Sequence, residues 1–162
     1  MILDLSQVLT NPGASLDIDA STNIGDVALN GQNIHFIRPI ELKGTVKNIS
    51  GLIYLDLKCK AYFETQCSRC LDTISEQLDF EVCERLSKSD ADEDVLIIES
   101  YEFDLDETVI KSFGLELPIN YICSSNCKGL CHVCGCNLNH TKCDCEDDNI
   151  DPRLAALKDF LK

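Results

Sequence analysis

The most regular feature of the sequence is an alternation of apolar and polar residues in its first half. Residues 40–47, 53–64 and 74–82 each place mostly apolar or small residues at every second position, with mostly charged or polar residues between them. This period of two is typical of antiparallel strands that bury one face and expose the other. Residues 48–51, with the sequence NISG, fit a hairpin turn between the first two stretches. The pattern therefore predicts an antiparallel meander.

Two later stretches have helical patterns. In the first, Asp104 can cap the N-terminus with Glu107 three residues later, and Pro118 ends the helix. A second, shorter helix is predicted at the C-terminus, where Asp151 can cap and Pro152 suits the first helical position. The apolar residues of the first helix recur on one face: Leu105, Val109, Ile110, Phe113 and Leu117.

Length and composition fit a sheet domain with an appended module. The chain has 162 residues, of which 44% are hydrophobic, enough for one core. We therefore expect an α+β protein with an antiparallel β-sheet meander, one packing helix, a C-terminal cysteine-rich zinc module and a short C-terminal helix. The expected division is a β-rich domain over residues 1–117, with its helix at about 105–117, and a zinc-binding module with the final helix over residues 118–162.

The charge of the chain restricts its partners. The formal net charge is -14, and an acidic surface disfavours sequence-independent binding to nucleic acid. The first residues, MILDLSQVLTNPG, contain neither a basic segment followed by an apolar run nor a membrane span. We therefore expect a cytoplasmic protein, in which thiols stay reduced and clustered cysteines more often hold metal than form disulfides.

Cysteines are concentrated near the C-terminus, where seven of the chain's 11 lie between Cys123 and Cys145. A structural zinc ion takes four thiolate or imidazole ligands in a tetrahedron. The CHVCG segment places Cys131 and Cys134 at a spacing that lets both sulfur atoms reach one ion, so these are the firmest candidates. The other two are predicted to be Cys127 and Cys145. Further residues of the segment rank lower: Cys123 and Cys143 come next, and Cys136, His132 and His140 are less favoured.

A separate CxxC pair, Cys67 and Cys70, follows the second predicted strand. Two interpretations stay open. The pair is either two half-buried thiols at a turn, which we favour, or part of a zinc site, which would be a second site or one shared with the CHVC segment. Redox catalysis is disfavoured in the C-terminal segment, because its CxxC lacks the strand-then-helix context that lowers a thiol pKa.

One basic patch interrupts the acidic background. On the predicted hairpin the wet face carries four lysines together with Tyr54 and Tyr62, and Arg69 follows within the CSRC segment. Such a face could bind RNA through phosphate contacts and base stacking, or it could be an ordinary lysine-bearing strand face that discourages edge aggregation. The acidic segment around residues 92–94 fits a basic protein partner or a solvated loop. The four lysines are Lys43, Lys47, Lys58 and Lys60.

Several motifs together resemble a known family. The segments CSRCLD, CKGLCHVCGCNLN, CDC and DPRLAALKDFL are similar in order and spacing to the bacterial YceD family of large-ribosomal-RNA-subunit accumulation proteins. The positions that carry the resemblance include the pair Cys67 and Cys70 with Arg69 between them, the C-terminal cysteines, Gly129 and Asn139.

The resemblance implies a function. It implies a non-enzymatic factor that supports synthesis, processing or accumulation of 23S rRNA by binding rRNA or a basic ribosomal protein, with no membrane and no small-molecule substrate. The alternative is an RNA-processing or thiol-redox enzyme that uses the CxxC cysteines. We disfavour it, because the sequence has no recognisable carboxylate pair, Ser-His-Asp arrangement or glycine-rich phosphate loop.

Overall fold

The computed structural model describes residues 1–88, 95–98 and 100–145. It divides them into two compact units. The first, which we call the sheet unit, comprises Met1–Gln66 and Thr73–Tyr121. The second, the cysteine unit, comprises Cys67–Asp72 and the described residues from Ile122 onward. The predicted C-terminal helix lies outside the described residues, and the predicted boundary between residues 117 and 118 stays a prediction.

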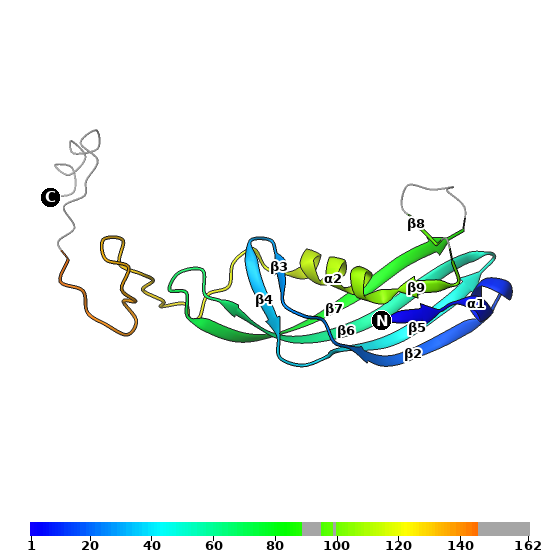
Figure 1. Ribbon diagram of the computed structural model, residues 1–162, viewed down its shortest axis with the longest axis horizontal. Coiled ribbons are helices and arrows are strands. Elements are labelled where there is room, and N and C mark those ends of the chain that lie inside the picture. The colour runs from blue at the N-terminus through cyan, green and yellow to red at the C-terminus, as the bar shows by residue number, and fades with distance from the viewer. Residues whose placement is uncertain (89–94, 99, 146–162) are drawn as a thin grey trace, which may run out of the picture. The chain divides into compact units, whose positions relative to one another are not determined.

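Three long antiparallel strands form the centre of the sheet unit (Figure 1). They are β5 (Ile40–Ile49), β6 (Leu52–Gln66) and β7 (Thr73–Ser87), and each pairs with the next. Ser50 and Gly51 join β5 to β6 with φ values of 55° and 95°, as in the two-residue turns that match the twist of a hairpin. The predicted meander of an α+β fold is confirmed, because the alternating apolar residues point into one core.

The N-terminal residues add strands that the sequence argument left out. β2 (Ser15–Thr22) pairs with β5 on the side away from β6. The hairpin of β3 (Val27–Leu29) and β4 (Gln32–Phe36) joins the sheet where β4 pairs with the end of β6. Its turn is an Asn-Gly pair with positive φ at both residues, 52° and 77°, which is the strongest short-range hairpin signal in a sequence.

Shorter elements complete the described part of the sheet unit. The helix α1 (Ser6–Thr10) follows β1 (Ile2–Asp4), which pairs with β9 (Glu102–Asp104) in a separate two-stranded sheet. The short strand β8 (Leu96–Ile97) pairs with the end of β7 in a parallel direction.

The predicted helix forms as α2 (Leu105–Glu116) and supplies the centre of the core (Figure 1). The Asp104 side chain accepts a hydrogen bond from the backbone N–H of Asp106, so the predicted N-cap is confirmed. The Phe113 ring lies 5.2 to 5.5 Å, centroid to centroid, from three other rings, within the range of favourable aromatic pairs. These rings belong to Phe36, Phe63 and Phe80. Neither described helix is long and apolar enough to cross a membrane.

Gly44 of β5 lies where two strands approach closely. A Cβ atom at this position would stand 2.0 Å from the carbonyl oxygen of Asp56 and 2.8 Å from the Cα of Leu57, both backbone atoms of β6. We expect Gly44→Ala to lower the free energy of unfolding by about 1–3 kcal/mol or more, because the pairing of two central strands must shift. Urea unfolding followed by circular dichroism measures this. Gly25→Ala is the control, because a Cβ there meets no atom within 4 Å, and an equal loss in both variants would contradict the argument.

Candidate metal centre

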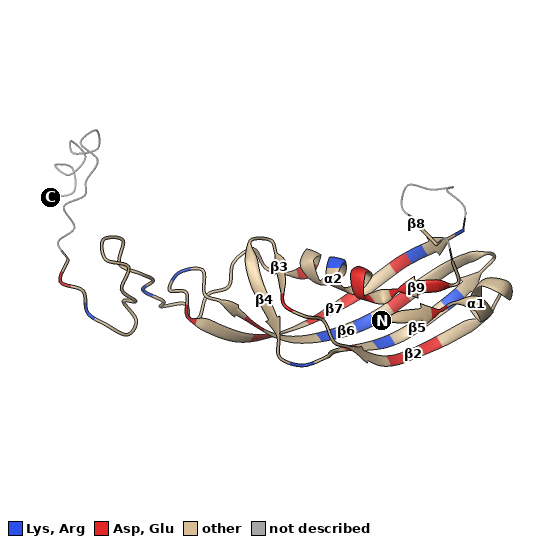
Figure 2. Ribbon diagram, in the orientation of Figure 1, with Lys and Arg blue, Asp and Glu red and all other residues tan. Residues whose placement is uncertain are grey.

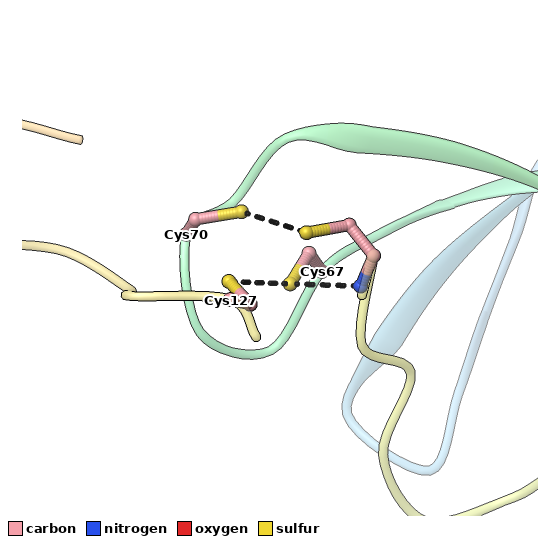
Figure 3. A group of neighbouring side chains, drawn as sticks. Cys67, Cys70 and Cys127 are labelled. Atoms are coloured by element: carbon pink, nitrogen blue, oxygen red, sulfur yellow. Dashed lines mark hydrogen bonds between the residues drawn. The ribbon is translucent and has the colours of Figure 1, made fainter. Parts of the chain in front are cut away.

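A first group of four cysteines converges in the cysteine unit. The sulfur atoms of Cys67, Cys70, Cys123 and Cys127 all lie within 4.8 Å of one another. The Cys67 and Cys127 sulfurs are 3.9 Å apart, and those of Cys70 and Cys123 are 3.6 Å apart. Four sulfurs held about 2.3 Å from a tetrahedral zinc ion would be separated by about 3.8 Å. Figure 3 shows the side chains of Cys67, Cys70 and Cys127 gathered at this point. The group could hold a metal ion.

Backbone N–H groups surround the Cys67 sulfur. Those of Arg69 and Cys123 donate to it over 3.5 and 3.4 Å. Burial alone would raise the pKa of the Cys67 thiol, but the hydrogen bonds from Cys123, Arg69 and Cys70 outweigh it and lower the pKa to about 6. Thiolate is the form that binds metals, so this sulfur is suited to ligation at neutral pH.

A second group contains Cys131, Cys134, Cys136 and Cys143, whose sulfur atoms also lie within 4.8 Å of one another. The Cys143 sulfur is 3.3 Å from that of Cys131 and 3.5 Å from that of Cys134. Gly135 closes the CHVCG turn with a φ of 72°, and its N–H donates to the Cys131 carbonyl over 2.8 Å. Hydrogen bonds, first from the backbone N–H of Cys136, lower the pKa of the Cys134 thiol to about 6. This group could also hold a metal ion.

Cys145 lies beside the second group without belonging to it. Its backbone N–H donates to the Cys143 sulfur over 3.4 Å. Hydrogen bonding with the thiols of Cys143 and Cys134 raises the pKa of the Cys145 thiol to about 12. The Cys145 thiol is therefore close enough to compete with Cys136 for the fourth position of the second group.

The structure divides the ligand set predicted from the sequence. Cys127 lies in the first group, whereas Cys131 and Cys134 lie in the second with Cys145 beside them. The two next candidates separate likewise, Cys123 into the first group and Cys143 into the second. The predicted set was drawn up for a single ion and therefore combines thiols from both groups.

The CxxC pair of the CSRC segment lies at the turn between β6 and β7, and its role stays a prediction. Cys67 and Cys70 are buried, and their neighbours are Cys123 and Cys127 rather than the CHVC segment. Cys136, which ranked low in the sequence argument, lies in the second group. The spacing Cys123-x3-Cys127 is the signal that could have suggested a second pair of ligands.

Two asparagines tie the segments of the cysteine unit together. Asn139 accepts a hydrogen bond from the Lys128 N–H over 2.8 Å and donates to the Cys127 sulfur over 3.4 Å. Asn137 donates to Asp72 over 2.9 Å. These contacts connect the loop at residues 67–72 to residues 127–139. The sequence argument included Asn139 only by family resemblance and did not identify Asn137 or Asp72.

Gly129 and Arg69 add to this framework. Gly129 has a φ of 75°, and a Cβ there would lie 3.2 Å from the Arg69 carbonyl oxygen, so the position favours glycine. That same carbonyl accepts the Leu130 N–H over 3.1 Å. The Arg69 guanidinium donates to the Cys127 carbonyl over 3.3 Å. Arg69 therefore supports the first cysteine group and belongs to the cysteine unit, not to the strands that carry the predicted lysine face.

The residues of the predicted lysine face alternate with buried residues along β5 and β6, and Figure 2 shows basic residues on both strands. Lys43 faces Lys58 across the two strands, and Lys47 faces Tyr54. The Arg38 guanidinium lies 5.0 Å from the centre of the Tyr62 ring, so a base that stacked on this ring would compete with a cation–π contact. A shallow depression is lined by three of the lysines together with acidic neighbours: Glu41, Lys43, Lys58, Lys60, Asp79 and Glu81.

Carboxylates from the neighbouring strands flank these lysines. Asp19 of β2 lies 3.7 Å from the Lys43 ammonium, and Asp79 of β7 lies 3.5 Å from that of Lys60. Glu81 is opposite Lys58 in the register of β6 and β7. The face therefore carries both signs of charge, and binding of RNA or another partner to it stays a prediction.

The fold and the cysteine groups together define a class of protein. It is an α+β protein in which an antiparallel sheet with one packing helix accompanies a cysteine unit that could bind metal. The chain belongs to the YceD family, because the family model described as "Large ribosomal RNA subunit accumulation protein YceD" matches residues 55–161, more than half of its length. The family resemblance inferred from the cysteine motifs is confirmed.

Several relatives resemble the chain over different lengths. An uncharacterized protein of Mycobacterium leprae is 26% identical over 99% of this chain and 77% of its own. The uncharacterized protein YlbN of Bacillus subtilis is 25% identical over 93% of this chain and 91% of its own. The chloroplastic "Large ribosomal RNA subunit accumulation protein YCED homolog 1" of Arabidopsis thaliana is 43% identical over 35% of this chain and 17% of its own. No solved structure matches the chain.

Proposed function

We propose that this protein is a non-enzymatic factor that supports accumulation of large-subunit ribosomal RNA. The observation that carries the proposal is the family match, which extends over β6, β7, α2 and the cysteine unit. The name of the family implies a role in accumulation of large-subunit ribosomal RNA. The cysteines support a structural role for the metal, because four thiolates around one ion leave no position open for a substrate.

The expected result in cells is a loss of large-subunit RNA. Deletion of the gene is expected to lower the ratio of large-subunit to small-subunit ribosomal RNA, and the wild-type gene should restore it. Quantitative electrophoresis of total RNA measures this ratio. An unchanged ratio in slow and fast growth would contradict the proposal. Purified protein incubated with precursor ribosomal RNA tests the enzymatic alternative, which requires cleavage that Cys67→Ser or Cys131→Ser abolishes.

For the mode of action we favour a basic protein of the large subunit as the direct partner. The net charge of -14 repels phosphate and attracts a basic surface. The carboxylates beside Lys43 and Lys60 lower the positive potential of the lysine face, which is the region predicted from the sequence to bind RNA. A role for rRNA as the direct partner rests on the lysines and on Tyr54, whose ring lies on the same face.

A pull-down with charge variants distinguishes the two partners. Neutralising four acidic positions of the sheet face is expected to weaken capture of a basic ribosomal protein several-fold at low salt, because the attraction is electrostatic. Neutralising the four lysines to glutamine is the matched control and should leave capture unchanged. Treatment with RNase should not release the partner. Release by RNase, or loss of capture in the lysine variant alone, would favour RNA. The acidic substitutions are Asp17→Asn, Asp19→Asn, Asp79→Asn and Glu81→Gln.

A further inference from the structure

We propose that the cysteine unit binds two zinc ions, one in each group of four thiols, and not one ion shared between them. Each group gathers four sulfur atoms within 4.8 Å of one another, the number and spacing that one tetrahedral ion requires. No cysteine belongs to both groups among the described residues. The proposal concerns the metal content alone and does not depend on the ribosomal role.

Disulfide bonds do not account for the same geometry. The contacts between sulfur atoms in the two groups are 3.3 to 3.9 Å long, whereas a disulfide bond is about 2.05 Å long. All 11 cysteines are free. A set of four soft thiolates selects zinc over magnesium, calcium and manganese, which prefer oxygen ligands. On binding, each thiol that ligates loses its proton to water, and the Zn²⁺ ion with four thiolates carries a net charge of about -2.

In both groups, hydrogen-bond donors contact sulfur atoms and would partly offset that negative charge. In the first, the Cys67 sulfur accepts two backbone N–H groups, and the Cys127 sulfur accepts the Asn139 side-chain amide over 3.4 Å. In the second, the Val133 N–H donates to the Cys131 sulfur over 3.4 Å, and the Cys143 sulfur accepts another backbone N–H over the same distance. Donors of this kind orient thiolates and stabilise them around a metal ion.

The described part of the cysteine unit has hydrogen bonds but only a small apolar core. Among its described residues, the one cluster of buried apolar side chains consists of three metal-ligand candidates, Cys67, Cys70 and Cys127. The described segment from residue 122 to 145 has no helix or long strand, only an isolated bridge between Leu130 and Asn137. A segment without an apolar core folds when metal ligation supplies the free energy. Two ions placed in succession would fix both halves of this segment.

The geometry assigns the fourth thiolate of the second ion to Cys136. Its sulfur lies within the group formed by Cys131, Cys134 and Cys143, whereas that of Cys145 lies outside it. Cobalt(II) is the probe for this assignment, because its absorption distinguishes four thiolates from three thiolates and one oxygen. Cys136→Ser is expected to convert one of two cobalt ions to the second type, and Cys145→Ser to leave both unchanged. The reverse result would overturn the assignment of Cys136.

The experiment that tests the proposal is native mass spectrometry of the full chain. Protein prepared under reducing conditions and exchanged into metal-free buffer is expected to retain two zinc ions. The paired substitution Cys67→Ser and Cys70→Ser should remove at least one ion, and so should Cys131→Ser with Cys134→Ser. Cys83→Ser is the control: this cysteine is exposed on β7 of the sheet unit and should leave both ions in place.

The count in the unsubstituted protein decides the outcome, so a variant that fails to fold does not obscure it. One ion per chain, or none, would overturn the proposal. Retention of two ions by either paired variant would also overturn it, because one of the proposed sites would then be dispensable. Two separate thiolate sites are established if the wild type and Cys83→Ser each bind two ions and each paired variant binds fewer.

Discussion

Removal of zinc by a chelator is expected to unfold the cysteine unit while the sheet unit keeps its structure. Binding of structural zinc by small metal-dependent domains contributes about 10–16 kcal/mol per ion at neutral pH. No other source of comparable size is present in the described part of the cysteine unit, whose buried apolar cluster is three cysteines. The sheet unit has a core of its own, built from residues such as Ile40, Leu55 and Phe113, which are fully buried.

Hydrogen exchange resolved by mass spectrometry measures this outcome. After chelation, peptides from residues 122–145 should lose amide protection, whereas peptides from the centres of β5 and β6 should keep theirs. Restoring zinc should return the protection, which distinguishes release of metal from irreversible damage to thiols. The interpretation of the metal as structural would be wrong if residues 122–145 stayed protected in protein shown to be metal-free.

The central strands of the sheet were predictable, because the alternation of buried and exposed residues is visible within a single short segment. Every second residue is buried along β6, and along β5 with the exception of Gly44, so one short window of sequence reveals both the strand and its inner face. The same logic applies to α2, whose cap and apolar stripe lie within a single segment. The N-terminal hairpin carries an equally local signal, because Asn30 and Gly31 form a turn pair with positive φ at both residues.

The charge of the sheet face was not predictable from the hairpin alone. Asp19 precedes Lys43 by more than twenty positions and reaches it only because β2 pairs with β5 across an intervening hairpin. A count of charges along β5 and β6 therefore includes the lysines but not the carboxylates that lie beside them on β2 and β7. Pairings between distant strands decide the sign of such a face.

The grouping of the cysteines has the same non-local origin. Spacing indicates which thiols can turn toward one ion, as in Cys131-x2-Cys134, but it does not say which pairs converge. The loop that carries Cys67 lies 56 residues before Cys123, and the two sulfur-bearing segments meet through the hydrogen bond from the Cys123 N–H. Sequence alone therefore predicted a thiolate metal site, and the thiols that it combined lie in the two groups that the structure describes.

Phe113→Ala is expected to be the most damaging single substitution in the sheet unit. Its side chain is fully buried on α2 and contacts the rings of Phe36, Phe63 and Phe80. Truncation of a buried phenylalanine costs about 3–5 kcal/mol, through lost burial and the cavity that remains. The loss here should lie toward the upper end, because three strands supply the rings that would be left without a partner. Equilibrium unfolding in urea, followed by the circular dichroism of the sheet, measures the change.

Leu115→Ala on the same helix is the matched control, because that leucine is 86% exposed and should change the unfolding free energy by no more than about 0.5 kcal/mol. The number of zinc ions bound to folded Phe113→Ala protein should equal that of the wild type, since none of the proposed ligands packs in the phenylalanine cluster. Chelation would then destabilise the cysteine unit through loss of metal, and Phe113→Ala would destabilise the sheet unit through loss of apolar packing. A loss below about 1 kcal/mol for Phe113→Ala would show that the four rings do not form the centre of the core.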